Sequence, residues 1–212
     1  GLYWGGPMGF SRNNSFAFDV AGTRCQSVAD LDGNGYLEVV YPTISGDMAI
    51  LWNGPGGFDN ERKTLLPGEV AVASEIADLN GDGFLDLIFC NLMKTEGDRK
   101  ANTPIYWGSA EGYDDDRREE FPLPEATNFP TLADLDRDGF LDMINHSTIG
   151  RSNVLWGSAT GFGTREPLFL KTDAATTSRV ADLDGNGWLD LIFPGRVDVD
   201  TVSRHTKSCL LY

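Results

Sequence analysis

The sequence is short of several features that would place it in familiar classes. It has only three cysteines among 212 residues (Cys25, Cys90 and Cys209), too few for a disulfide scaffold. The odd number leaves open whether all three are thiols or two of them form a disulfide. No apolar run approaches the roughly 18 residues of a membrane-spanning helix. We therefore expect no direct insertion into a membrane.

Basic residues are also scarce, with 17 Lys and Arg against 32 Asp and Glu and a formal net charge of −15. Such a chain lacks the clustered cations that attract nucleic acids, and anionic membrane surfaces repel it. The two histidines, His146 and His205, suggest no catalytic triad and are interpreted as surface or capping residues. No glycine-rich phosphate loop precedes a helix. We therefore expect no enzymatic activity.

The chain does contain a repeat with a period near 50 residues. One element reads ADLDGNGYLEVV, ADLNGDGFLDLI, ADLDRDGFLDMI and ADLDGNGWLDLI, and its first aspartates are Asp30, Asp78, Asp134 and Asp182. A second element, W-G…G-F/Y, recurs in step with it. Its tryptophans are Trp4, Trp52, Trp107 and Trp156. The repeat divides the chain into four units, approximately 1–48, 49–103, 104–152 and 153–212.

Each unit consists of short apolar runs broken by glycine, proline and aspartate, without the i, i+3, i+4, i+7 spacing of helical repeats. From the second unit into the third we predict strands over 69–77, 84–90, 104–108 and 119–123. Four strands in about 50 residues are typical of a propeller blade. We therefore predict an all-β fold, a β-propeller of four-stranded antiparallel blades. Residues 210–212 repeat the strand at 2–4, which favours part of a larger propeller over a ring of four blades.

Each unit also carries a nine-residue acidic loop with side-chain oxygens at positions 1, 3, 5 and 9. Glycine at position 6 suits a sharp turn, and leucines at positions 2 and 8 are expected to anchor the loop ends in the core. Calcium takes six to eight oxygen ligands, and position 7 can add its main-chain carbonyl. The predicted ligands are Asp30, Asp32, Asn34, Tyr36 and Glu38; Asp78, Asn80, Asp82, Phe84 and Asp86; Asp134, Asp136, Asp138, Phe140 and Asp142; and Asp182, Asp184, Asn186, Trp188 and Asp190.

Carboxylates packed this closely repel one another unless a cation lies between them. We therefore predict about four Ca²⁺ per chain. A metal-free turn would explain one such loop more easily than four in register. An EF-hand needs Glu at position 12 and flanking helices, whereas here position 12 is Tyr41, Phe89, Asn145 or Phe193.

The aromatic residues of the W-G…G-F/Y elements are interpreted as packing residues. The tryptophans are expected to lie between blades. The residues that end each element, Phe10, Phe58, Tyr113 and Phe162, are expected in the core. Trp188 differs because it lies inside an acidic loop, where partial exposure is expected.

The D-x-[DN]-x-[DN]-G-x-x-[DE] loops and the W-G…G-F/Y elements resemble the FG-GAP/VCBS repeats, the calcium-binding propeller blades of integrin α-subunits and many secreted bacterial proteins. The resemblance covers essentially the whole chain. It implies that each loop joins the first two strands of a blade, on one face of the propeller. It also implies calcium rather than magnesium. Family propellers usually have about seven blades, whereas this chain has four repeats.

The resemblance implies a non-catalytic, calcium-stabilised binding or adhesion module for a protein or glycan, in an extracellular, secreted or cell-surface setting. One alternative is an accessory propeller of a larger secreted carbohydrate-active enzyme. Another is a structural assembly element, for which self-association or the remaining blades of a longer chain would be the partner. Sequons at Asn13 and Asn145 are weak indications of secretion.

Overall fold

A computed structural model describes residues 1–20, 22–44, 46–93, 102–122, 130–146, 151–172, 175, 177–194 and 209–211. These residues form seventeen β-strands and one 3₁₀ helix, η1 (Asp115–Arg117), with no α-helix among them. The predicted all-β class is therefore confirmed. The strands pair in antiparallel sheets, in which consecutive strands are neighbours.

Three sheets have four strands each. Sheet 1 consists of β3 (Ser27–Ala29), β4 (Glu38–Tyr41), β5 (Met48–Leu51) and β6 (Lys63–Leu66). Sheet 2 consists of β7 (Val70–Ala77), β8 (Asp86–Met93), β9 (Asn102–Tyr106) and β10 (Arg118–Pro122). Sheet 3 consists of β11 (Thr131–Ala133), β12 (Asp142–Asn145), β13 (Arg151–Leu155) and β14 (Leu168–Lys171).

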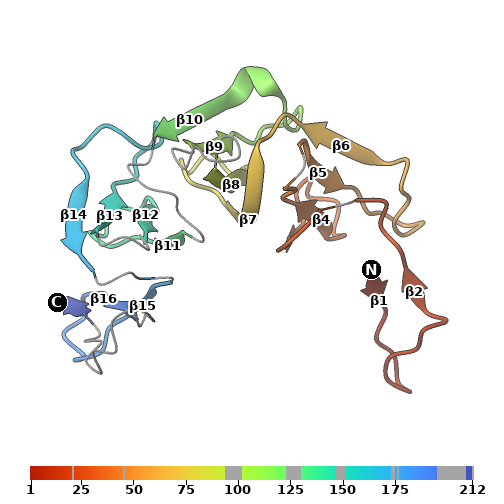
Figure 1. Cartoon of the computed structure of the whole chain (residues 1–212), viewed down its shortest axis with the longest axis horizontal. Helices are drawn as coiled ribbons and strands as arrows, with labels where there is room; N and C mark the ends of the chain where they lie inside the picture. The colour runs from red at the N-terminus through yellow and green to blue at the C-terminus, as the bar shows by residue number, and fades with distance from the viewer. Residues whose placement is uncertain are drawn as a thin grey trace.

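Two smaller groups of strands flank these sheets. The N-terminal hairpin pairs β1 (Leu2–Tyr3) with β2 (Ser15–Phe16). Sheet 4 consists of β15 (Arg179–Ala181), β16 (Asp190–Phe193) and β17 (Cys209–Leu211). Figure 1 shows the hairpin and the four sheets following one another along an open arc, with β6, β10 and β14 on its outer rim. The described residues therefore do not close into a ring of four blades.

The four strands predicted between residues 69 and 123 correspond to β7, β8, β9 and β10, which confirms the four-stranded antiparallel pattern. Sheets and repeat units are offset from each other. Each sheet begins with the strand before its acidic loop, whereas each unit after the first begins near the third strand of a sheet. A period alone defines no starting point, so the sequence leaves this offset undetermined.

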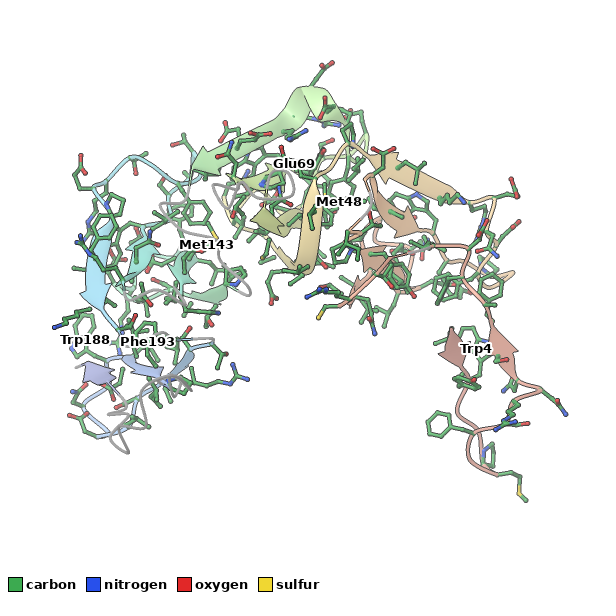
Figure 2. The ribbon with its side chains drawn as sticks, in the orientation of Figure 1. Trp4, Met48, Glu69, Met143, Trp188 and Phe193 are labelled. Carbon is green, nitrogen blue, oxygen red and sulfur yellow. The ribbon has the colours of Figure 1, made fainter. Side chains whose placement is uncertain are left out.

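The apolar core lies between neighbouring sheets rather than at one centre. Met48 belongs to a cluster formed by sheets 1 and 2, and Met143 to a cluster formed by sheets 2 and 3. Figure 2 shows both methionines along the interior of the arc. The middle strands β4, β5 and β12 are buried along their whole length. Such strands are covered on both faces, so they carry continuous apolar runs rather than alternating ones.

The first strands of adjacent sheets are joined by hydroxyl hydrogen bonds. The Ser27 hydroxyl donates to the Ser74 carbonyl (2.6 Å), which links β3 to β7. Ser178, directly before β15, donates its hydroxyl to that of Thr131 in β11 (2.7 Å). Each pair is 47 residues apart, so the bonds recur with the period of the repeat. They fix the inner edges of neighbouring sheets relative to one another.

The expectation that all loop leucines are buried was wrong at the ends of the arc. The position 2 leucines of the first three loops pack in the cluster shared with the following sheet. Leu183, in the last loop, has no following sheet in the described structure and is 50 % exposed. Among the position 8 leucines, Leu37 and Leu189 are exposed as well. The burial of these leucines depends on surroundings that the local sequence does not specify.

Two polar residues at the end of β12 are buried, contrary to expectation. His146 was interpreted as a surface or capping residue, yet it is 2 % exposed, with Nδ1 3.4 Å from the Ser178 hydroxyl. Asn145 is also buried and donates its amide to Asn153 Oδ1 (3.0 Å). A glycan could not reach Asn145 in this fold, whereas Asn13 is exposed. His205 and Ser147 lie outside the described residues.

Acidification is expected to destabilise the fold through His146. Burial, and then the nearby Arg179 cation, lower the pKa of His146 from 6.5 to about 4. The unfolded chain therefore takes up this proton at a higher pH than the folded chain. The stabilising effect is complete above pH 6.5 and is lost as the pH falls towards 4. Between pH 7 and pH 5 we expect a loss of about 2 kcal/mol in unfolding free energy, measurable by urea denaturation.

A His146→Gln variant provides the control for this prediction. Carboxylates whose pKa is raised in the folded state act in the opposite direction, but they are present in both proteins and cancel in the difference. Equal pH dependence in the wild type and the variant would show that His146 is not the responsible group.

The sequence left open whether the three cysteines are free thiols or whether two of them form a disulfide. Cys25 and Cys90 are free thiols, and burial strongly raises the pKa of Cys90. A buried neutral thiol of this kind acts as a small apolar side chain. The side chain of Cys209 lies outside the described residues.

Candidate metal centres

All four acidic loops occupy the same place in their sheets. Each connects the first strand to the second: β3 to β4, β7 to β8, β11 to β12 and β15 to β16. This is the placement that the resemblance implies, and the structure confirms it. The side chains at positions 1 to 5 therefore project from a tight turn, while position 9 begins the second strand.

The position 1 aspartates organise the turn through main-chain hydrogen bonds. Asp30 accepts from the N–H groups of Asn34 (3.0 Å) and Gly35 (2.9 Å), one on each carboxylate oxygen. Asp134 does the same with Asp138 and Gly139 (both 3.1 Å). Such bonds wrap the chain around the carboxylate and hold its two oxygens in fixed directions. The equivalent residues Asp78 and Asp182 also accept main-chain N–H groups from their loops.

Two positions of each loop have left-handed backbone conformations. The position 6 glycines have φ between 85° and 95°, as the sequence predicts. Position 4 has the same conformation, which sequence reasoning missed: three loops have glycine there, and the third has Arg137 with φ 63°. A non-glycine residue in this region is uncommon. The third loop therefore has an arginine in a backbone conformation that glycine provides in the other three loops.

The position 9 carboxylates are buried and connect the loop to the third strand. Asp86 is fully buried and accepts from the N–H groups of Leu79 (2.8 Å) and Gly108 (2.9 Å). Asp142 accepts in the same way from Leu135 and Gly157. In sheets 1, 2 and 3 the second donor follows the tryptophan of the W-G element, and in sheet 1 it is Asn53, which donates to Glu38 (3.3 Å). Sequence reasoning missed this role, although the constant distance between loop and tryptophan is a signal of it.

Burial raises the pKa of three of these carboxylates. It raises the pKa of Asp86 to about 6, with the charges of Asp82 and Asp78 adding to the effect and the two N–H donors opposing it. Burial likewise raises the pKa of Glu38 and of Asp142. Opposite charge nearby favours the ionised form of a carboxylate. A cation in each loop would therefore offset the electrostatic cost of this arrangement.

The carboxylates converge in three of the four loops. Among the described residues, ligand oxygens lie within 4.8 Å of one another in the sets Asp30, Asp32, Glu38; Asp134, Asp136, Asp138; and Asp182, Asp184, Asp190. Two oxygens that bind one calcium ion at about 2.3–2.6 Å lie no more than roughly 5 Å apart. The spacing therefore fits a single calcium ion in each of these loops. In the third loop, one oxygen of Asp136 is buried without a hydrogen-bond partner. A buried carboxylate oxygen of this kind fits the role of a metal ligand.

Positions 5 and 7 interact within each loop. The position 5 side chains accept the N–H of position 7, as Asn34 does from Tyr36 (2.8 Å) and Asp82 from Phe84 (2.9 Å). The aromatic side chain at position 7 is partly exposed, and most so at Trp188 (53 %). The expectation for Trp188 is thereby confirmed.

Two arginines that sequence reasoning missed surround the third loop. Arg165 donates to Asp136 Oδ2 (2.6 Å), and its guanidinium lies 3.9 Å from the centre of the Trp156 ring. Arg137 stacks on Trp188 of the next loop at 4.4 Å. The positive charge of Arg165 would compete with a metal ion for Asp136, one of the four carboxylates of this loop. No regular spacing in the sequence marks either arginine as part of the site.

A family model described as an FG-GAP-like repeat matches residues 3–89 and 134–193, which include all four acidic loops. The chain belongs to the FG-GAP-like repeat family. The first matched range contains nearly all of the hairpin, sheet 1, β7 and the first half of β8, and the second contains β12, β13 and β14 of sheet 3 with β15 and β16 of sheet 4.

Two solved structures share this arrangement of sheets. A crystal structure of BBS1N in complex with ARL6DN, soaked with mercury, matches with a TM-score of 0.52 and 16 % identity over 83 % of this chain and 48 % of that one. The same complex soaked with lead matches with a TM-score of 0.51 and the same identity and coverage. The FG-GAP-like chain therefore spans about half the length of the structure it resembles. At this identity the likeness shows the fold alone.

No curated protein matches the sequence. In the part of the chain that the structure describes, no helix has the length and apolar character required to cross a lipid bilayer.

Proposed function

We propose that this FG-GAP-like chain is a non-catalytic binding module in which calcium pins the first hairpin of each sheet. The observation that carries the proposal is the convergence of three carboxylates in the same loop of sheets 1, 3 and 4. Carboxylate, amide and carbonyl oxygens at this spacing are the ligands that calcium prefers. The second loop has the same residue types, so we propose about four ions per chain.

The role proposed for calcium is structural. When bound, the ion would neutralise carboxylates that otherwise repel one another across a tight turn. The residues that would hold it are the twenty predicted at positions 1, 3, 5, 7 and 9 of the loops. These loops lie between strands whose remaining residues form the interfaces between sheets. Ordering the loops would therefore stabilise these interfaces between sheets.

We also propose a type of binding partner and a location for the module. The similar BBS1N structure was solved in complex with ARL6DN, a protein partner, and the partner proposed here is a protein or a glycan. We place the module outside the cell because calcium is abundant there. Extracellular calcium modules typically have Kd values of about 10⁻⁴–10⁻³ M.

Calcium titration tests the proposal directly. Native mass spectrometry of the purified chain should show about four calcium ions per molecule, and isothermal titration calorimetry should give submillimolar affinities. Magnesium at the same concentration serves as the control and should displace little calcium. Binding of no ion would refute the metal centres. Kd values far below a micromolar would instead contradict the extracellular setting.

A further inference from the structure

The third acidic loop differs from the other three in the number of its carboxylates. At positions 1, 3, 5 and 9 the other loops each have three carboxylates and one asparagine. The third loop has four carboxylates at these positions, Asp134, Asp136, Asp138 and Asp142. The affinity of a calcium loop rises with the number of charged ligands. On its ligands alone, the third loop should therefore bind calcium more tightly than the others.

An arginine outside the loop offsets the extra carboxylate. Arg165, in the turn between β13 and β14, donates to Asp136 Oδ2 (2.6 Å). Among the described residues, this is the only ion pair that involves a predicted metal ligand. The single positive charge brings the four negative charges of the third loop to a net −3. The three carboxylates of each other loop give the same value.

Arg165 is held in place by an aromatic ring as well as by the carboxylate. Its guanidinium lies 3.9 Å from the centre of the Trp156 ring, and attraction between a cation and an aromatic face is strongest for tryptophan. Trp156 in turn packs against the cluster shared by sheets 3 and 4. An exposed ion pair normally loses much of its strength to side-chain entropy. Stacking on a fixed ring lowers that loss for Arg165.

Sheets 1 and 2 have an arginine in the same turn, but it has a different role there. Arg62 donates to the carbonyls of Trp52 (3.3 Å) and Gly57 (2.8 Å). Arg117 donates to the carbonyl of Gly112 (3.0 Å). Both arginines directly precede the fourth strand of their sheet and close the turn from which they come. Neither forms an ion pair with an acidic loop.

In sheet 3 the turn is closed without its arginine. Arg165 follows the aromatic residue of its element by three positions, whereas Arg62 and Arg117 follow theirs by four. The carbonyl of Gly161, equivalent to that of Gly112, accepts from the Ser158 hydroxyl (2.6 Å). The shorter spacing thus accompanies an arginine that contacts the acidic loop instead of its own turn.

The second arginine near this loop is directed elsewhere. Arg137 occupies position 4, and its guanidinium stacks on Trp188 of the fourth loop. Among the described residues, no carboxylate forms an ion pair with Arg137. Arg165 is therefore the residue whose charge acts directly on a ligand of the third loop.

The contact leaves room for an ion on the same carboxylate. Arg165 occupies Oδ2 of Asp136, while Oδ1 is buried without a hydrogen-bond partner. Asp134, Asp136 and Asp138 still offer one oxygen each within 4.8 Å of one another. A calcium ion and the guanidinium would then lie on opposite oxygens of one carboxylate, close enough for their like charges to repel each other.

We infer that Arg165 lowers the calcium affinity of the third loop and thereby brings it close to that of the other loops. The inference rests on the calcium sites of the proposed function and identifies a residue that sets the affinity of one of them. Four sites of similar affinity fill over the same range of calcium concentration. Without Arg165, the third loop would fill first and sheet 3 would be stabilised before the others.

A calcium titration followed by NMR tests this inference loop by loop. The position 6 glycines donate their N–H groups to the position 1 aspartates, so each amide resonance reports on its own loop. These glycines are Gly35, Gly83, Gly139 and Gly187. With ¹⁵N-glycine labelling at low ionic strength, all four should shift with similar midpoints in the wild type. In Arg165→Gln the midpoint of Gly139 should fall roughly 3- to 10-fold, with the other three unchanged.

Three further variants separate the charge of Arg165 from its other contacts. Arg165→Lys keeps the charge and should retain most of the wild-type midpoint. Arg62→Gln removes an arginine that bonds only to main-chain carbonyls, so the Gly139 midpoint should stay unchanged. Adding Asp138→Asn to Arg165→Gln returns the loop to a net −3 and should bring the midpoint back towards the wild-type value.

The outcomes distinguish this inference from the proposed function. Calcium-dependent shifts of all four glycines, with a Gly139 midpoint unchanged by Arg165→Gln, would overturn the inference and leave the metal centres intact. An equal change in Arg62→Gln would overturn it as well. If calcium shifted none of the four resonances, the metal centres would be refuted and this inference with them.

Discussion

Transfer from millimolar calcium into EGTA is expected to lower the midpoint of thermal unfolding by roughly 10–20 °C. At a calcium concentration about tenfold above Kd, each site adds about 1.4 kcal/mol, and four sites add several times that. A domain of this size typically has a total stability of about 5–15 kcal/mol. Removing the ions leaves thirteen carboxylates repelling one another in four turns. Differential scanning calorimetry in the two buffers measures the effect.

Two comparisons make this measurement specific. Magnesium in place of calcium should restore little of the lost stability. Magnesium demands a near-ideal octahedron of ligands, whereas calcium, the larger ion, accepts irregular oxygen sites such as these. An Asp134→Ala/Asp138→Ala double variant removes two ligands of the third loop and should lose part of the calcium-dependent increase while keeping the rest. Identical melting curves with calcium and with EGTA would mean that the loops are metal-free turns.

Replacing Asp86 by alanine is expected to lower the unfolding free energy by about 3–5 kcal/mol, even in EGTA. The substitution leaves the N–H groups of Leu79 and Gly108 without an acceptor, and an unsatisfied buried donor costs about 1–3 kcal/mol. The carboxylate therefore has a structural role that does not depend on metal. Urea denaturation of the wild type and the variant in EGTA measures this part alone.

Asp82→Ala provides the matched control in the same loop. Asp82 is exposed and accepts from Phe84 and Asn80 at the surface. Loss of the Asp82 carboxylate should change the unfolding free energy in EGTA only slightly. Its main effect should be a smaller increase in stability when calcium is added. If the two variants were equally stable in EGTA, the buried hydrogen bonds of Asp86 would not have the importance assigned to them.

Much of the fold could be predicted because the same pattern occurs four times. An isolated apolar run such as 84–90 is compatible with a strand or a buried helix. Four aligned copies, each broken by glycine and aspartate at the same places, leave only the strand. The conformation at Gly35, Gly83, Gly139 and Gly187 followed from the loop sequence for the same reason. These features are set by residues close together in the chain.

Features that depend on the neighbouring sheet could not be predicted in this way. Phe10 was expected in the core by analogy with Phe162, yet it is exposed because nothing precedes the hairpin in the described structure. Leu183 differs from Leu79 for the corresponding reason at the other end. The link between Asp86 and Gly108 joins residues 22 positions apart. Identical local sequences thus have different surroundings, and only the three-dimensional arrangement distinguishes them.

Because apolar clusters join each sheet only to its immediate neighbours, the molecule behaves as a one-dimensional array. In such an array the free energy of unfolding is approximately the sum of the intrinsic stability of each sheet and the interaction of each sheet with its nearest neighbours. Among the described residues, sheets 1, 2 and 3 have a coupling on each side, whereas sheet 4 has one. Amide protons of sheet 4 should then exchange with solvent before those of sheet 2, since opening starts where one coupling is missing. Protection against exchange would decline from the middle of the arc towards its ends.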